Sequence, residues 1–90
     1  MRKMKHNPMM KRDNFILTYS DIKDNSIKIY SESWCESKND FNSFIYLYPE
    51  DKFLEIKGYS KAEIEIIMQD VRKLAPIAYE YEKNKEYEYA

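Results

Sequence analysis

Glycine, histidine and cysteine are nearly absent from this 90-residue chain, which has one of each. With Gly58 as its only glycine, the chain cannot build the glycine-rich loops that cradle phosphate groups in nucleotide-binding proteins. His6 lies in a basic N-terminal segment without any periodicity, so the expected folded part lacks the usual general base. Cys35 has no second cysteine for an internal disulfide or a zinc site, and we expect a cytoplasmic protein.

Long apolar runs are missing as well. No stretch approaches the ~20 apolar residues that span a bilayer. The basic segment 1–11 precedes only three consecutive apolar residues at 15–17, too few for a secretory signal. Mean hydropathy of -0.81 and a charged fraction of 34% argue against a membrane protein, and 43% hydrophobic residues argue against a disordered chain. The length fits one domain with one core.

Patterns that carry catalytic chemistry are absent too. The 16 acidic residues lack the alternate spacing of a calcium-binding loop, and no carboxylate pair stands out as a general acid and base. Cys35 has no histidine in the folded part to activate it as a nucleophile. We therefore expect a non-catalytic protein without a metal site or a cofactor.

Charge is distributed unevenly along the chain. The first twelve residues hold five basic residues and no acid, which leaves ten basic residues and all 16 acids for the rest, a charge of -6. Because Lys and Arg dominate phosphate affinity, an acidic body disfavours direct nucleic-acid binding by that body. Residues 1–13 are interpreted as a flexible basic arm, which could still touch phosphate.

One segment carries the signals of a well-formed helix. Ser60 and Glu63 have the spacing of a capping box, and Gly58 allows the chain to turn into the helix. An apolar stripe follows at spacings of three and four residues: Ile64, Ile67, Met68, Val71, Leu74, Ala75 and Ala78. Pro76 predicts an end or a kink near Ala75, with a frayed tail at 86–90.

Four runs ahead of this helix are typical of strands, at residues 15–19, 26–34, 42–48 and 53–57. Asp24 and Asn25 tolerate positive φ and predict a tight connection between the first two. Pro49 predicts a type I turn between the last two. The fold class is therefore α+β, a four-stranded antiparallel meander with a C-terminal helix packed on one face, and residues 14–85 form the domain.

The alternation within these strands suggests which sheet face is buried. Three aliphatic pairs at period two, Ile27 and Ile29, Ile45 and Leu47, and Leu54 and Ile56, match the aliphatic stripe of the helix and are assigned to the core. An aromatic face would then remain as a partner-binding surface, with residues Tyr30, Phe44, Tyr46, Tyr48 and Phe53. The segment after Pro76, a second copy of the chain or another protein could cover it. The acidic helix exterior, with Glu63, Glu65 and Asp70, is a further candidate for partner contacts.

Residue usage in Ser26–Tyr30 and Tyr79–Lys85 resembles that of small proteins encoded by phages and mobile elements of low-GC Gram-positive bacteria, anti-CRISPR proteins among them. The resemblance implies a cytoplasmic location in a bacterial host and a partner that is itself a protein. We expect a protein-binding module that inhibits a nucleic-acid-handling or defence protein, with the acidic body facing a basic partner surface. The alternatives are a single-stranded nucleic-acid binder that uses the basic arm, and a homodimeric structural or assembly subunit.

Overall fold

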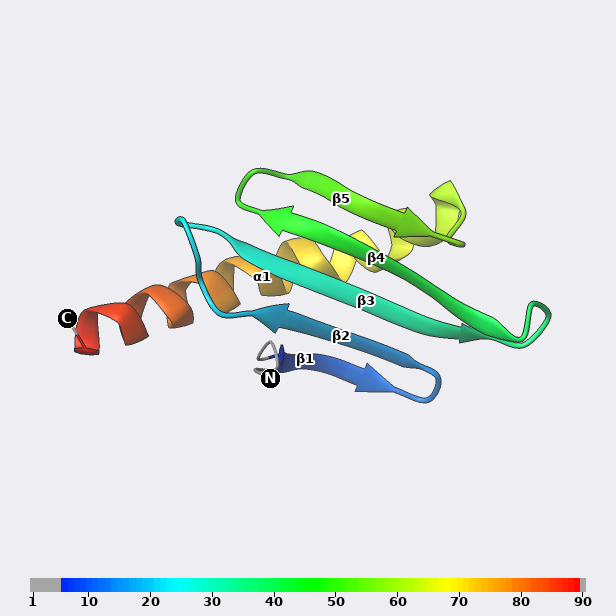
Figure 1. The fold of residues 1–90 in the computed structure, drawn as a ribbon, viewed down its shortest axis with the longest axis horizontal. Coiled ribbons are helices and arrows are strands. Elements are labelled where there is room, and N and C mark those ends of the chain that lie inside the picture. The colour runs from blue at the N-terminus through cyan, green and yellow to red at the C-terminus, as the bar shows by residue number, and fades with distance from the viewer. Residues whose placement is uncertain (1–5, 90) are drawn as a thin grey trace, which may run out of the picture.

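The computed structural model describes the backbone of residues 6–89 and the side chains of residues 7–85. It consists of an antiparallel sheet of five strands and one long helix (Figure 1). In chain order the elements are β1 (His6–Arg12), β2 (Phe15–Ser20), β3 (Ile27–Cys35), β4 (Asp40–Tyr48), β5 (Lys52–Lys57) and α1 (Lys61–Tyr89). Strands follow one another in space as they do in sequence. The α+β class, the meander and the C-terminal helix on one face are therefore confirmed, with five strands instead of four.

The additional strand is β1, so the flexible arm expected at residues 1–13 is wrong for His6–Arg12. This segment pairs antiparallel with β2, and the register shifts between Pro8 and Met10. An edge strand pairs through its backbone on one side only and tolerates proline, so it needs no apolar alternation of its own. The sequence pattern had no signal for it. Residues 1–5 of the expected arm lie outside the described residues.

Two of the expected turns can be compared with the structure. Asp24 and Asn25 have φ values of 54° and 64°, and Lys23 and Ser26 exchange two backbone hydrogen bonds across them, which confirms the tight connection. The Pro49 turn differs from the expected type I form. Its Tyr48–Pro49 peptide is cis, and its hydrogen bond runs from the Asp51 N–H to the Leu47 carbonyl, one residue further than in a type I turn.

The start of α1 has the expected cap. The Glu63 N–H donates to the Ser60 hydroxyl at 3.2 Å, and the Ser60 N–H donates to the Glu63 carboxylate at 2.7 Å. Gly58 has a φ of 85°, a conformation that other residues rarely adopt. The same glycine lies against the Asn42 side chain, with no room for a Cβ. The capping box and the turn at Gly58 are confirmed.

The helix does not end at Pro76 but continues to Tyr89. Of the end or kink expected near Ala75, the end is therefore wrong, and the tail expected to fray at 86–90 is helical as far as Tyr89. Packing explains why. Ala78 and Glu82 are buried beyond the proline, and the Tyr79 ring packs on Tyr48 while its hydroxyl donates to the Asn25 carbonyl. These contacts offset the hydrogen bond that proline removes. The last turns run past the end of the sheet (Figure 1).

The buried face of the sheet is not the one expected. In the β3–β4 register Ile29 lies opposite Tyr46, and Ser31 opposite Phe44, so the aromatic residues of β4 share a face with the isoleucines of β3. Phe44 and Tyr46 are only 1% and 3% exposed. The core is formed by Leu17, Tyr19, Ile27, Ile29, Phe44, Tyr46, Met68, Val71, Ala75 and Ala78.

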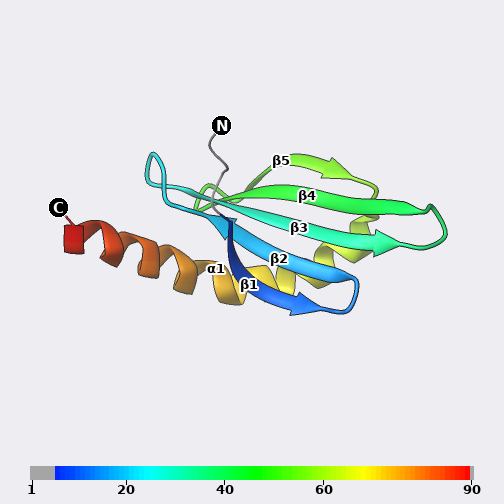
Figure 2. The same cartoon turned by 60° about the horizontal axis from the view of Figure 1, so that its bottom comes forward.

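The expected aliphatic core is therefore correct for β3 and for the helix stripe but wrong for β4 and β5. Ile45 and Leu47 point to the face that the helix does not cover. Leu54 and Ile56 are 45% and 47% exposed, because β5 is the edge strand and no described element packs beyond it. The aromatic face that could have bound a partner is instead closed by α1 within the monomer (Figure 2).

Two tyrosine hydroxyls in this interior have polar partners. Tyr59 reaches across the sheet to the hydroxyls of Ser31 and Ser33, at 2.9 and 2.5 Å. The Tyr46 hydroxyl donates to the Asp51 carboxylate. Burial first, and then this hydrogen bond, raises the pKa of Tyr46. No buried side-chain nitrogen or oxygen in the described part of the chain lacks a hydrogen-bond partner, as a well-packed core requires.

Candidate protein-binding face

We call the sheet surface turned away from α1 the open face, and the register defines its residues in rows. One row crosses all five strands: Pro8, Thr18, Tyr30, Ile45 and Glu55. The next row runs parallel to it: Lys11, Ile16, Glu32, Ser43 and Lys57. Lys28, Leu47 and Lys52 form a shorter third row. Figure 2 shows α1 on the opposite side, and no element within residues 6–89 covers the open face.

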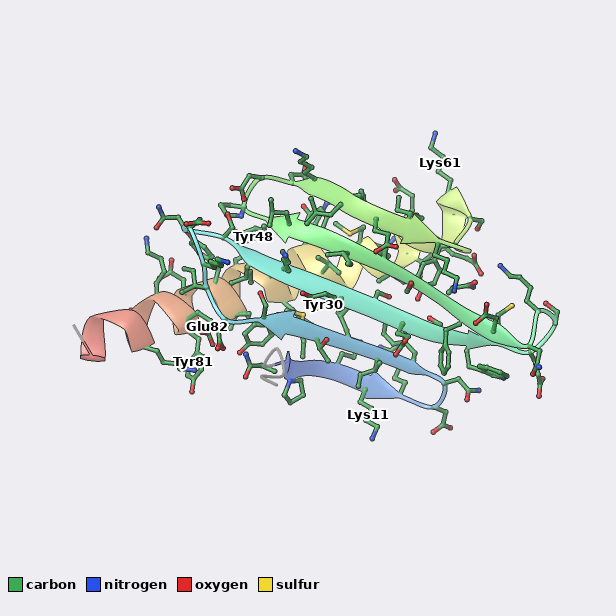
Figure 3. All side chains as sticks on the ribbon, viewed as in Figure 1. Lys11, Tyr30, Tyr48, Lys61, Tyr81 and Glu82 are labelled. Atoms are coloured by element: carbon green, nitrogen blue, oxygen red, sulfur yellow. The ribbon has the colours of Figure 1, made fainter. Side chains whose placement is uncertain are left out.

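The first two rows form a shallow concavity of about 500 Å³. Its floor is mainly apolar, with the half-buried side chains of Ile16, Thr18, Tyr30 and Ile45. Tyr30 comes from the central strand and lies near the middle of the sheet (Figure 3). Burial raises the pKa of the Tyr30 hydroxyl, so the group is neutral at physiological pH. The concavity is an apolar hollow at the centre of a sheet face that no element within residues 6–89 covers.

On the open face the acidic residues lie at the concavity and the lysines lie around it. Of the residues that the structure describes, Glu32 and Glu55 are the charged ones that line the concavity. Lys11, Lys28 and Lys52 lie on the same face outside it, and Figure 3 shows Lys11 on β1 at the edge of the sheet. The salt bridges among the described side chains are Lys57–Asp40 and Lys85–Glu82. Neither glutamate of the concavity is therefore neutralised by a described residue.

The residues expected to bind a partner do not form one surface. Tyr30 is on the open face, Phe44 and Tyr46 are in the core, and Tyr48 and Phe53 are half-buried and pack against that core. The acidic residues of α1 lie on the opposite side of the sheet from Tyr30 (Figure 2). Of the expected aromatic set, only Tyr30 belongs to the uncovered face.

The acidic residues Glu63, Glu65 and Asp70 are not brought together either. Glu63 is used in the helix cap, where hydrogen bonding by Ser60, first through its backbone and then through its side chain, lowers the pKa of the carboxylate. Glu65 follows Glu63 by about 200° around the helix, so the two point in different directions. Glu65 is exposed and Asp70 is half-buried.

The interpretation of the sequence missed most of the open face: Pro8, Ile16, Thr18, Glu32, Ile45 and Glu55. The register follows from the bounds of the loop between β3 and β4, which the strand pattern alone did not give. Residues 36–39 of this loop are even in number, and Cys35 pairs with Asp40 across it. An even loop pairs odd-numbered with even-numbered residues, which places Ile29 beside Tyr46 and leaves Ile45 beside Tyr30.

A second, smaller groove of about 270 Å³ lies between the first turns of α1 and the ends of β2 and β3. Phe15, Tyr59 and Ile66 contribute to its wall, with Cys35 at one end. The Cys35 thiol lies 3.4 Å from the Ser37 hydroxyl, and this hydrogen bond is the main cause that lowers the pKa of the thiol. No described histidine stands beside it as a base.

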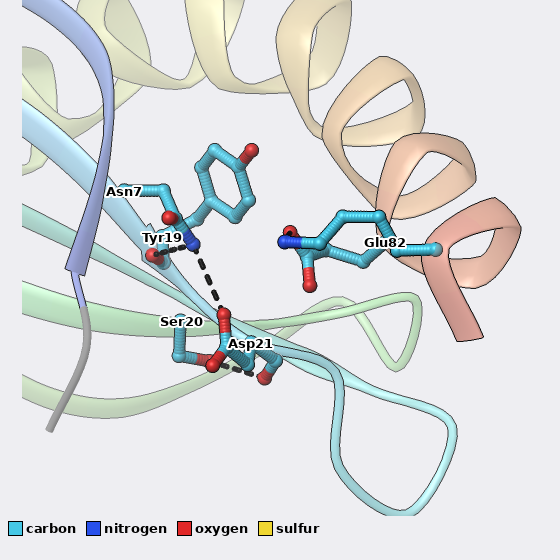
Figure 4. A network of polar contacts seen from close by, with 6 residues as sticks. Asn7, Tyr19, Ser20, Asp21 and Glu82 are labelled. Carbon is cyan, nitrogen blue, oxygen red and sulfur yellow. Dashed lines mark hydrogen bonds and ion pairs between the residues drawn. The ribbon is translucent and has the colours of Figure 1, made fainter. Parts of the chain in front are cut away.

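Two groups of polar contacts lie where the second half of α1 passes β1 and β2, one among strand and loop residues and one within the helix (Figure 4). Asn7 donates to the Tyr19 carbonyl and to the Asp21 carboxylate. Glu82, only 3% exposed, pairs with Lys85 at 3.4 Å one helical turn further on. Every described member of these two groups has a partner within the protein, so the contacts have a structural role.

Both edges of the sheet discourage strand addition. β1 has Pro8, which lacks an N–H, and a register irregularity beside it. β5 also has an irregular register, opposite Ile45 and Tyr46, and it begins and ends with Lys52 and Lys57. An antiparallel pair of two β5 strands would bring these lysines together. Bulges, proline and terminal lysines are common means of blocking edge pairing, so the open face is the better candidate for contacts.

No group of three or more potential metal ligands occurs in the part of the chain that the structure describes. The one helix within residues 6–89 does not combine the length and the apolar sequence that crossing a membrane requires. No protein-family model matches the chain, and neither a curated protein nor a solved structure matches it. The function is therefore inferred from the geometry of the open face.

Proposed function

We propose that this protein is a non-catalytic protein-binding module, and that it inhibits a nucleic-acid-handling or defence protein by docking its open face on it. The observation that supports the proposal most directly is the concavity at the centre of the uncovered sheet. A hollow with an apolar floor and a charged rim is the usual anatomy of a protein-binding site. Residues 6–89 hold 12 basic and 16 acidic residues, and this charge of -4 favours long-range approach to the basic surfaces of proteins that handle nucleic acids. At the contact itself the lysines of the open face attract acidic side chains.

The alternative of a nucleic-acid binder has less support. Lys11 and Arg12 belong to β1, so the end of the expected arm is part of the sheet and not a free basic segment. The charged residues among the described lining of the concavity are the glutamates Glu32 and Glu55, which repel phosphate. The homodimer was expected because a second copy could cover an exposed aromatic face. Phe44 and Tyr46 of that face are instead covered by α1, so this reason for a dimer no longer applies.

A capture experiment with matched variants tests the proposal. The tagged full chain and two variants, Ile45→Arg on the open face and Ile77→Arg on the exposed side of α1, are incubated with a lysate of a low-GC Gram-positive bacterium. Both changes add the same charge, and circular dichroism checks that both variants fold. A specific partner is retained by the wild type and by Ile77→Arg and is lost with Ile45→Arg.

The partner found in this way is then purified, and its nucleic-acid binding or nuclease activity is measured with and without the protein. Inhibition by the wild type but not by Ile45→Arg is the expected result. Equal retention of every captured protein by the two variants would show that the open face is not the binding surface. If the partner binds but is not inhibited, the protein is a binding module, and the proposal that it acts as an inhibitor is wrong.

A further inference from the structure

We infer that the concavity of the open face receives an arginine side chain of the protein partner. This inference rests on the proposed function, since it specifies the chemistry of the partner at the same surface. It starts from the charges of the hollow. Among the described residues, Glu32 and Glu55 are the charged ones that line it, and neither takes part in a salt bridge or a side-chain hydrogen bond with a described residue.

The negative charges of Glu32 and Glu55 determine which partner can bind, because a partner that covers the concavity would bury them. Both carboxylates are exposed to water in the free protein. A partner that covers the concavity removes that water, and a carboxylate left without a partner in an apolar contact is strongly unfavourable. A partner with only apolar side chains at this point would therefore bind weakly. A partner that places a cation between Glu32 and Glu55 compensates both carboxylates for the lost water, because the cation is attracted to each of them.

The floor of the hollow favours arginine over lysine. The half-buried Tyr30 is two residues from Glu32 on β3 and shares its face of the sheet, and Ile45 of β4 lies between Tyr30 and Glu55 in one row. Ile16 of β2 is the neighbour of Glu32. A guanidinium is planar and less strongly hydrated than an ammonium, so it can stack on an aromatic ring while its N–H groups donate to carboxylates. The arginine stem would then pack against the isoleucines.

The surrounding lysines limit which arginine fits. Lys11, Lys28 and Lys52 lie on the same face outside the hollow and make no salt bridge with a described residue. They repel a uniformly basic segment and attract acidic side chains. The charges of the open face are therefore complementary to a protein segment with one central arginine, apolar neighbours and acidic residues further out. A nucleic acid would instead direct phosphates toward the two glutamates.

NMR titration of the full chain tests this inference. The probe is a short capped peptide with a central arginine, a leucine on each side and an aspartate at each end. The expected result is chemical-shift change centred on Tyr30 and Ile45. The same peptide with citrulline, the neutral analogue of arginine, is expected to bind about tenfold more weakly or worse, and the lysine peptide should be intermediate.

Matched variants separate the two glutamates from general charge effects. Glu32→Gln combined with Glu55→Gln should weaken binding of the arginine peptide about tenfold or more. Glu65→Gln combined with Glu80→Gln removes the same charge from exposed positions of α1 and should leave it unchanged. A short single-stranded oligothymidine is the last probe, and it should not shift Tyr30 or Ile45.

Four outcomes overturn the inference: no shifts with the arginine peptide, equal binding of the citrulline peptide, equal losses in both double variants, or oligothymidine binding in the concavity. The proposed function can survive the first three. If a captured partner is lost with Ile45→Arg but retained by the Glu32→Gln and Glu55→Gln variant, the open face binds protein by some chemistry other than arginine recognition.

Discussion

Ile29 lies directly opposite Tyr46 in the antiparallel pair of β3 and β4, and both side chains point toward α1. This one pairing decides which face of the sheet is buried. It brings the aromatic residues of β4 under the helix and turns Ile45 outward, beside Tyr30. The surface that we propose for partner binding is therefore a hollow with a mainly aliphatic floor, one tyrosine and two glutamates among its described residues, and not a cluster of aromatic rings.

Substitutions on adjacent residues of β4 should have very different effects on stability. Phe44→Ala removes a fully buried ring from the core and is expected to cost ~3–5 kcal/mol of unfolding free energy. Ile45→Ala, on the half-buried open face, should cost about 1 kcal/mol. Urea denaturation followed by circular dichroism measures both. If Phe44→Ala does not fold, Phe44→Leu should still lower the urea midpoint more than Ile45→Val. Equal losses at the two positions would contradict the observed register.

The capping box should make stability depend on pH through Glu63. Its carboxylate accepts hydrogen bonds from Ser60, so its folded-state pKa lies below the usual value of 4.5. A lowered pKa means that the ionised form stabilises the fold above pH 4.5, and that this contribution is lost as the pH falls through the folded-state pKa.

Wild type and Glu63→Gln are compared by thermal unfolding over a pH series to observe this. The wild type should be the more stable at pH 6, and the difference should shrink as the pH falls below about 4.5. Glu65→Gln, at an exposed position outside the cap, serves as the control. A difference between wild type and Glu63→Gln that stays constant with pH would exclude the carboxylate as the source. Ser60→Ala should separately cost ~0.5–2 kcal/mol.

Tyr59 should be coupled to Ser31 through its hydroxyl. Tyr59→Phe leaves the buried Ser31 hydroxyl without its partner, and we expect a cost of ~1–3 kcal/mol. When Ser31 is already alanine, the same Tyr59→Phe change should cost less, because only the contact with Ser33 is lost. A double-mutant cycle by chemical denaturation measures the coupling. Additive effects of the two changes would mean that the hydrogen bond contributes nothing measurable.

Gly58→Ala should be destabilising for two reasons. The backbone there has a φ of 85°, and a Cβ would collide with the side chain of the buried Asn42. Incompatible glycine replacements cost more than the ~1 kcal/mol that alanine can gain from a less flexible unfolded chain. Asn42→Ala should relieve the collision, so Gly58→Ala should cost less in that background than in the wild type. A Gly58→Ala protein as stable as the wild type in thermal unfolding would contradict the turn geometry.

Several local features could be predicted because neighbouring residues determine them. The Ser60–Glu63 capping box, the positive φ values at Asp24 and Asn25, and the apolar stripe through Val71 and Ala75 were all predicted and are all observed. The end or kink near Ala75 was also a local inference, from Pro76, and the end is wrong. Tertiary contacts of Tyr79 and the burial of Ala78 and Glu82 stabilise a continuation that the local pattern disfavours.

Strand alternation determines which residues of one strand share a face, but it does not determine which faces of two strands coincide. In β4 both alternating sets are apolar, Phe44, Tyr46 and Tyr48 on one side and Ile45 and Leu47 on the other, so the sequence pattern permits either to be buried. A shift of one residue in the pairing of β4 with β3 would exchange the buried set and the exposed set. The number of residues in the loop at 36–39, and the area that α1 can cover, select the observed register.

The edge strand β1 also depends on contacts between distant segments and not on its local sequence. Its residues have no strand periodicity, and it exists because β2 offers an unpaired backbone edge once the sheet has formed. By itself the sequence therefore determined the turns, the helix cap and the apolar stripe, which depend on interactions within a few residues. Only the tertiary structure decided the register of β4 and the pairing of β1, and with them the residues of the open face, because those depend on contacts between distant segments.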